Sequence, residues 1–144
     1  MRFIITAAAD PNKTKSDGDA AFSKDMMAAY MKFNEELHKA GVLVASEGLN
    51  PSGKGARIGV ANGKRVVLDG PFAESKELIG GFYLITVKSL DEAVQWALRC
   101  PTGLGTDDIL TIHPMTEATD IPPEYLEVIK KAAPTWSASW GKGR

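Results

Sequence analysis

Three ionisable side chains lie in or at the ends of predicted strands and are candidates for moving protons. Asp69 ends one β-prone run before a Gly-Pro pair, Glu47 ends another before a glycine, and His113 belongs to a third. Partial burial raises the pKa of a carboxyl group towards that of a general base, and two carboxylates in one cleft drive their pKa values apart. An imidazole on a half-apolar strand face can shuttle protons near neutral pH. We therefore predict Asp69 as a general base, with His113 or Glu47 as its partner.

Each of these residues also has a purely structural interpretation. The Asp69 carboxylate can accept backbone N–H bonds and fix the turn after it. Glu47 can form a salt bridge with Arg57 or Lys76, and His113 can be a hydrogen-bonded structural histidine. The sequence alone leaves both interpretations open, because no spacing between these residues fixes their distance in the fold.

The loop at residues 70–80 carries most of the side chains that we predict to bind a ligand. It connects two predicted strands, and loops held by a rigid scaffold commonly carry binding groups. The predicted ligand-binding residues are Phe72, Glu74 and Lys76 on this loop and Arg57 on a strand before it. A hydrophobic plug for Phe72 and a solvated surface for the charged residues are the structural alternatives.

The sequence holds no pattern typical of a metal or nucleotide cofactor. Its two histidines, His38 and His113, stand at no metal-ligand spacing from a cysteine or an acidic residue. The glycines near residues 53–55, 80–81 and 103–105 match neither the dinucleotide fingerprint nor the phosphate-binding loop. We therefore expect chemistry that uses no metal and no cofactor.

Charge and composition argue against nucleic acid and membrane partners. The 144 residues include 17 basic and 18 acidic residues, and neither sign collects into a long run. No stretch approaches the roughly 20 apolar residues that span a bilayer. The lone Cys100 allows no disulfide within the chain and agrees with a reducing compartment, so we assign it a packing role. We expect a cytoplasmic protein with a single core.

Hydrophobic periodicity and turn signals divide the chain into strands and helices. Helix 23–40 begins at an N-cap serine and repeats apolar residues along one face, and helix 90–99 begins at a Ser-x-x-Glu capping box. Asn62-Gly63 lies between two β-prone runs and predicts a type I′ hairpin over residues 56–69. The expected strands are 2–8, 42–47, the two strands of the hairpin, 81–88 and 108–115.

The order of these elements predicts an α+β fold, a ferredoxin-like βαββαβ unit with an inserted hairpin. Such a unit forms an antiparallel sheet with both helices on one face. The other face still carries apolar residues on several strands, which a sheet of this size does not leave in water. We predict that a second copy of the chain covers this face, so that the protein is a homodimer.

The run 68–77, followed by 80–85, resembles the signature of the YCII-related proteins of the DGPF branch. It consists of Leu-Asp-Gly-Pro-Phe-Ala-Glu-Ser-Lys-Glu and later Gly-Gly-Phe-Tyr-Leu-Ile. The resemblance covers residues 1–116, which we predict to form the family domain, and leaves 117–144 as a C-terminal helix and tail. We expect that helix to end at Pro134. The resemblance implies a dimeric α/β barrel made of two ferredoxin-like units.

The resemblance leaves three hypotheses for the function. Related barrels include muconolactone isomerase and a chloromuconolactone dehalogenase, which implies cofactor-free isomerisation or elimination on a small carbonyl or lactone-like compound. The alternative is a non-catalytic dimer that binds a small molecule or serves as a regulatory accessory module. A third hypothesis, a structural interaction module, needs no cleft. A polar-lined cavity containing Asp69 would favour the first two hypotheses over the third.

Overall fold

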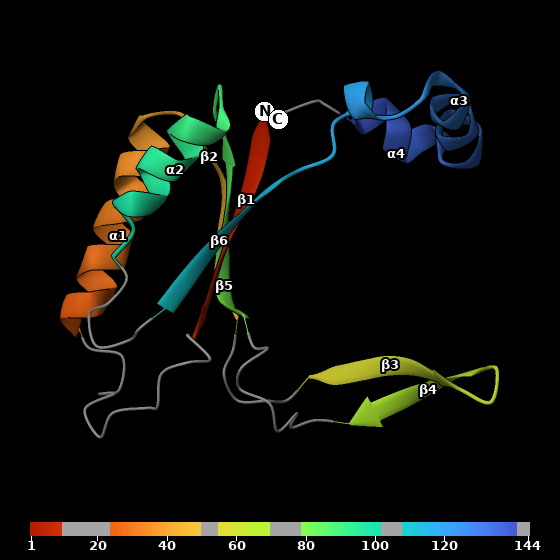
Figure 1. The fold of residues 1–144 in the computed structure, drawn as a ribbon, viewed down its shortest axis with the longest axis horizontal. Helices are drawn as coiled ribbons and strands as arrows, with labels where there is room; N and C mark the ends of the chain where they lie inside the picture. Colours follow the sequence, from red (N-terminus) through yellow and green to blue (C-terminus); the bar gives the residue numbers. More distant parts are fainter. Residues whose placement is uncertain (10–23, 50–54, 70–78, 102–107, 141–144) are drawn as a thin grey trace.

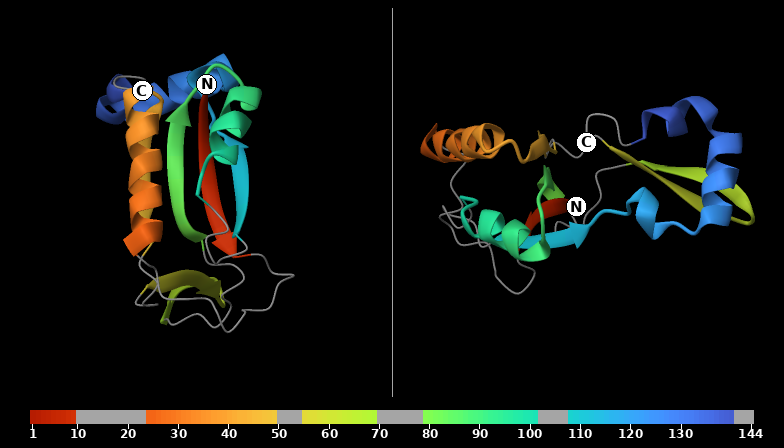
Figure 2. Two further views of the ribbon diagram at one scale, coloured as in Figure 1. Left: turned by 90° about the vertical axis from the view of Figure 1, so that its left-hand side faces the viewer. Right: turned by 90° about the horizontal axis from the view of Figure 1, so that it is seen from above.

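The computed structural model describes residues 1–9, 24–49, 55–69, 79–101 and 108–140 (Figure 1). Two helices form a layer against a sheet, and a hairpin and two C-terminal helices lie on the other side of it (Figures 1 and 2). The elements in chain order are β1 (Arg2–Ala9), α1 (Lys24–Lys39), β2 (Leu43–Gly48), β3 (Ala56–Ala61), β4 (Lys64–Asp69), β5 (Ile79–Thr86), α2 (Leu90–Leu98), β6 (Asp108–Pro114), a 3-10 helix (Ala118–Asp120), α3 (Pro123–Ala132) and α4 (Pro134–Ser139).

The main sheet is antiparallel and has the strand order β2-β5-β1-β6. The N-terminal strand β1 therefore lies in the interior of the sheet, between two strands from the second half of the chain. With the β3–β4 hairpin set aside, this order is consistent with a ferredoxin-like fold. Helices α1 and α2 cover one face of the sheet (Figure 2). The predicted α+β architecture is confirmed, whereas the second subunit of the predicted barrel stays a prediction.

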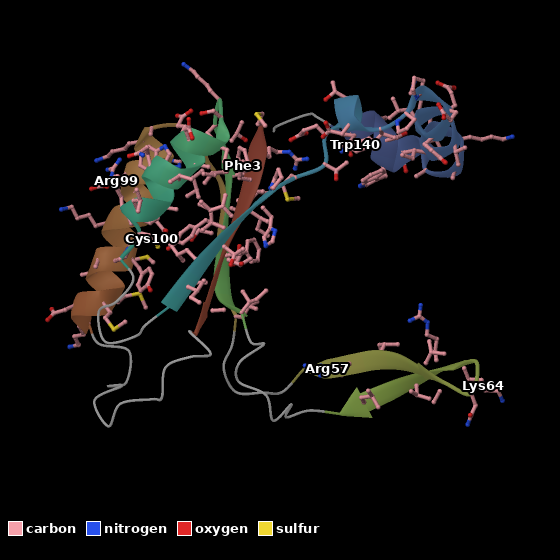
Figure 3. All side chains as sticks on the ribbon, viewed as in Figure 1. Phe3, Arg57, Lys64, Arg99, Cys100 and Trp140 are labelled. Carbon is pink, nitrogen blue, oxygen red and sulfur yellow. The ribbon has the colours of Figure 1, made fainter. Side chains whose placement is uncertain are left out.

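The hydrophobic core lies between this sheet and the two helices. Phe3 on β1 and Ile85 on β5 are almost fully buried, and they meet Phe33 and Leu37 of α1. The ring of Phe33 also packs edge-on against Tyr83, with 5.4 Å between the ring centroids. Side chains fill the space between the layers around Phe3 and Cys100, as Figure 3 shows. The helix face of the sheet is thus closed within one chain.

Helix α2 begins with the predicted capping contacts, with one difference. The Ser89 hydroxyl oxygen accepts a hydrogen bond from the Glu92 amide at 3.1 Å. The Glu92 carboxylate accepts its bond from the Lys88 amide at 2.8 Å, one residue before the amide that a capping box would use. Helix α1 is followed by Gly41 with a φ of 72°, a conformation that favours glycine after a helix end. Among the described helices, none is long and apolar enough to cross a membrane.

The predicted hairpin is present as β3 and β4, joined by Asn62 and Gly63. These two residues have φ angles of 52° and 75°, as a type I′ turn requires. The hairpin extends away from the main sheet, and Arg57 and Lys64 mark its two ends in Figure 3. It exposes large aliphatic side chains to solvent, among them Ile58, Val60 and Val67.

The C-terminal segment forms two short helices instead of one helix and a tail. Pro123 begins α3, as expected. The predicted end of this helix at Pro134 is confirmed, since α3 ends at Ala132. The tail after it differs from the prediction, because Pro134 begins α4; its fixed φ angle and missing N–H suit the first turn of a helix. The rings of Trp136 and Trp140 pack on each other with 5.1 Å between their centroids. Both this segment and the hairpin lie on the side of the sheet opposite α1 and α2 (Figures 1 and 2).

Candidate functional site

The face of the main sheet opposite α1 and α2 is called the open face here. Successive residues of a strand point to opposite faces, so the residues that alternate with the buried Phe3, Ile5, Tyr83 and Ile85 belong to it. Apolar and hydroxyl side chains occupy its middle, and ionisable groups lie towards its margins. Its described members are Ala45, Glu47, Phe82, Leu84, Thr86, Arg2, Ile4, Thr6, Ala8, Ile109, Thr111 and His113.

His113 lies on β6, which forms one edge of the sheet. Its cross-strand neighbour on β1 is Ile4, and two residues away Thr111 pairs with Thr6. The His113 side chain is exposed. An imidazole on this strand therefore stands between apolar and hydroxyl neighbours, as the sequence predicted, and its role in proton transfer stays a prediction.

Glu47 lies on β2, at the opposite edge of the same face. Its cross-strand neighbour is Phe82, and its side chain is exposed. A close approach of the two strands fixes its position, because a Cβ at Gly81 would lie only 2.8 Å from the Glu47 backbone oxygen. Glycine at this point of β5 lets β2 come close and hold the glutamate at the margin of the face.

The sheet brings Glu47 and His113 to one face but does not bring them together. Strands β5 and β1 lie between β2 and β6. Three strand spacings of about 4.8 Å separate the two edges by about 14 Å. A proton-transfer contact needs about 3 Å between heavy atoms. Within one chain, Glu47 and His113 cannot act as a direct acid–base pair.

Asp69, the predicted base, is the last residue of β4, where its backbone pairs with Ala56 at the base of the hairpin. Its predicted position at a strand end is confirmed, and its side chain lies outside the described part of the structure. Phe72, Glu74 and Lys76 also lie outside the described residues. Of the predicted ligand-binding residues, Arg57 is described, and it lies exposed on β3 opposite Leu68.

An ion pair that the sequence did not reveal joins the N-terminus to the C-terminal segment. The guanidinium of Arg2, only 7% exposed, donates to the Glu117 carboxylate through Nε at 2.9 Å and Nη2 at 3.3 Å. The hydrogen bond from Arg2 is the main cause that lowers the pKa of Glu117. A buried arginine needs such a partner, and this one holds the segment after β6 against β1. No sequence signal links the two residues, which stand 115 positions apart.

One buried hydroxyl on the open face lacks a hydrogen-bond partner within the described residues. The Oγ1 atom of Thr86, the cross-strand neighbour of Arg2, is shielded from solvent and makes no hydrogen bond. Leaving a buried polar atom unsatisfied costs free energy. Together with Thr6 and Thr111 it supplies hydroxyl groups to a face that is otherwise largely apolar.

A cavity in the C-terminal segment holds none of the predicted site residues. It has a volume of about 240 Å³ and lies among α3, α4 and the residues before them. Pockets for small molecules typically measure about 300–1,000 Å³, so this one is small for a ligand. Its lining includes Glu117, which is already engaged by Arg2. We do not assign the predicted chemistry to this cavity.

Tyr83 and Cys100 belong to the core and not to a reactive site. Burial is the main cause that raises the pKa of the Tyr83 phenol, and the neighbouring Cys100 adds to it. A phenol in this environment stays protonated. The Cys100 thiol is buried in the same core cluster, in agreement with the packing role expected from the sequence.

Comparisons with known proteins test the family resemblance that the sequence showed. The family model of the YCII-related domain matches residues 1–116. An uncharacterized protein of Rhizobium meliloti (strain 1021) is 34% identical over 126 residues, which cover 85% of this chain and 91% of the relative. A solved structure of 5-chloro-2-hydroxyhydroquinone dehydrochlorinase from Burkholderia phenoliruptrix AC1100, in complex with 2,5-dihydroxybenzoquinone, is 15% identical. The superposition of the two structures covers 85% of this chain and 100% of the dehydrochlorinase chain, with a TM-score of 0.44.

Proposed function

This chain belongs to the YCII-related domain family, and from that premise we propose that it acts as a homodimer whose two open faces enclose a small-molecule site. The bound compound is a small carbonyl or lactone-like molecule. Side chains of the site move a proton on it without a cofactor, in an isomerisation or an elimination. Membership of the family supports the fold, and the open face supports the chemistry.

The composition of the open face carries this proposal. Its half-buried apolar side chains, such as Leu84 and Phe82, can hold the body of a small molecule. The threonine hydroxyls beside them, those of Thr6 and Thr111, can fix the orientation of a carbonyl oxygen. Small-molecule sites commonly combine an apolar lining with a few polar groups in this way.

His113 is the described residue best suited to move the proton. Imidazole accepts and returns protons near neutral pH, so one side chain can act as base and then as acid. In an isomerisation, it takes a proton from a carbon next to the carbonyl group, and the electron pair moves towards the carbonyl oxygen. A threonine hydroxyl donates a hydrogen bond to that oxygen. The imidazolium then returns the proton to another carbon.

One observation favours the alternative of a binding module without turnover. Glu47 and His113 stand at opposite edges of the sheet, so within a single chain these two side chains do not form an acid–base pair. A dimer that only binds a small molecule needs the apolar middle and the hydroxyl groups, but not that pair.

Native mass spectrometry of the protein with a metabolite extract tests the proposal and needs no guess at the compound. We expect a dimer that retains a small carbonyl compound, and a His113→Gln dimer that retains less of it. Incubation of the retained compound with protein in D₂O then separates the two functions, because acid–base turnover exchanges carbon-bound protons with solvent. Deuterium uptake supports the enzyme, retention without uptake supports the binding module, and a monomer contradicts both.

A further inference from the structure

We infer that the acid–base site is shared between two subunits, so that His113 of one subunit works with the partner subunit's Glu47. This inference rests on the proposed function, because it names what completes that site. The two residues are on the same face but about 14 Å apart across the sheet, three strand spacings of about 4.8 Å. A second copy of the chain can place its β2 edge, with Glu47, near His113, and its β6 edge, with His113, near Glu47.

The sheet order sets which strands face each other once the direction of the two-fold axis is chosen. When two open faces meet around a two-fold axis parallel to the strands, left and right edges exchange. Strand β6 of one subunit then lies over β2 of the other, and the same contact occurs twice, as a two-fold interface requires. Each His113 edge therefore faces a Glu47 edge of the partner.

The register of the strands sets how near the two side chains come. Ala45, Leu84, Ile4 and His113 form one cross-strand row, and Glu47 lies one row further along β2. Two residues along a strand span about 7 Å, and packed sheets lie about 10 Å apart. Long side chains from facing sheets can bridge much of this distance. The imidazole and the carboxylate then flank a space of the size of a small molecule.

Charge selects this arrangement over the other two-fold packing. An axis perpendicular to the strands would place β2 over the partner's β2, so that the two Glu47 carboxylates approach each other. Like charges facing each other in an interface are unfavourable, whereas an imidazole ring opposite the Glu47 carboxylate can donate a hydrogen bond to it. The charge of Arg2, which lies on the same face, is already matched by Glu117.

The open face of the sheet alone is too small to form a stable dimer interface. Four strands about 4.8 Å apart and seven residues long give a footprint of roughly 450 Å². A stable interface buries about 800 Å² per partner. The hairpin and the C-terminal helices lie on the same side as the open face and carry exposed apolar side chains, including Val67 and Val128 (Figure 1). These projections supply the remaining area when the partner packs between them.

Cross-linking of mixed subunits tests the shared site directly. Separately purified His113→Cys and Glu47→Cys proteins are mixed, allowed to exchange subunits, and treated with a short bis-maleimide. We expect covalent dimers in the mixture and few with either protein alone. The parent protein, whose Cys100 is buried, and a mixture of His38→Cys with Glu47→Cys are the controls. Efficient self-linking of Glu47→Cys, or dimers without any linking, overturns the shared site but leaves the homodimer intact.

Complementation gives a functional readout of the same arrangement. His113→Gln and Glu47→Gln should each retain less of the compound than the parent protein, and the capacity that each loses is the quantity to be recovered by mixing them. Random exchange makes half of the dimers mixed, and each mixed dimer has one intact site of two, so one quarter of the sites are intact and about one quarter of the lost capacity returns. No recovery, or full retention by either single variant, overturns the inference. A monomer in light scattering contradicts the proposed function itself.

Discussion

The two faces of the main sheet are built from the same strands and differ in almost every physical property. On the helix face, Ile85 is fully buried and belongs to a core completed within one chain. On the open face, the adjacent Leu84 is only half-buried and has hydroxyl and ionisable groups around it. Successive residues of a strand point to opposite faces, so neighbouring residues can serve different roles. The residues of the helix face stabilise the subunit, and those of the open face can contact a partner subunit and a ligand.

Truncating two neighbouring residues on β5, one on each face, should give the largest difference in the free energy of unfolding between the faces. We expect Ile85→Ala to lower the free energy of unfolding by about 2–5 kcal/mol, because it leaves a cavity in a closed core. Leu84→Ala should cost less than about half as much, since its side chain is already partly in water. Urea denaturation below the dimer dissociation constant measures both. Equal losses would contradict the separation of tasks.

A charge introduced on the open face should weaken dimerisation without unfolding the subunit. Leu84→Asp would bury an unpaired carboxylate between two subunits, so we expect at least about tenfold weaker dimerisation by analytical ultracentrifugation. The far-ultraviolet circular dichroism should stay unchanged. Leu90→Asp is the matched control, because Leu90 is 52% exposed on the helix layer. If both variants dimerise like the parent, the open face is not the interface.

Removal of the Arg2–Glu117 pair should have a moderate and pH-dependent effect. The pKa of Glu117 is lowered in the folded state, so its contribution is present above the ordinary glutamate pKa and is lost as pH falls through the lowered value. Glu117→Gln should cost about 1 kcal/mol at pH 7, allowing for a carboxylate that is one third exposed. Thermal melts should show this difference at pH 7 and none in strong acid. A constant difference would contradict the ion-pair mechanism.

Asp69→Asn should have the smallest effect on stability and a large effect on function. The substitution keeps the shape and most hydrogen bonding but removes the charge and the basicity. We expect the free energy of unfolding to stay within about 1 kcal/mol of the parent, while retention of the small molecule is lost. A variant that melts earlier but still binds would show that Asp69 only fixes the turn after β4.

Local signals predicted most of the fold. The Asn62-Gly63 turn and the Ser89 cap act within a few residues, so the sequence contains all the information that they need. Pro134 was correctly predicted to end the helix before it, but the helix after it was missed. Proline both ends helices and begins them, and the second outcome depends on whether the residues after the proline can form a helical turn.

The candidate site was predicted less completely, because it depends on the order of strands in the sheet. The sequence identified Glu47 and His113 as candidates, but their distance is set by the two strands that separate them. The Arg2–Glu117 pair has no local pattern, since it joins β1 to the first residue of the C-terminal segment, 115 positions away. Chemistry-bearing residue types can therefore be found from sequence, whereas their pairing needs the fold.

The interior position of β1 has a consequence for synthesis on the ribosome. Its hydrogen-bonding partners are β5 and β6, which emerge long after it. At about 5–20 residues per second, β1 waits roughly 5–20 s for its last partner. During that time the apolar face of α1 has no sheet to pack on, so the nascent chain exposes the surface that chaperones bind. The subunit can close its core only when nearly the whole family domain has left the exit tunnel.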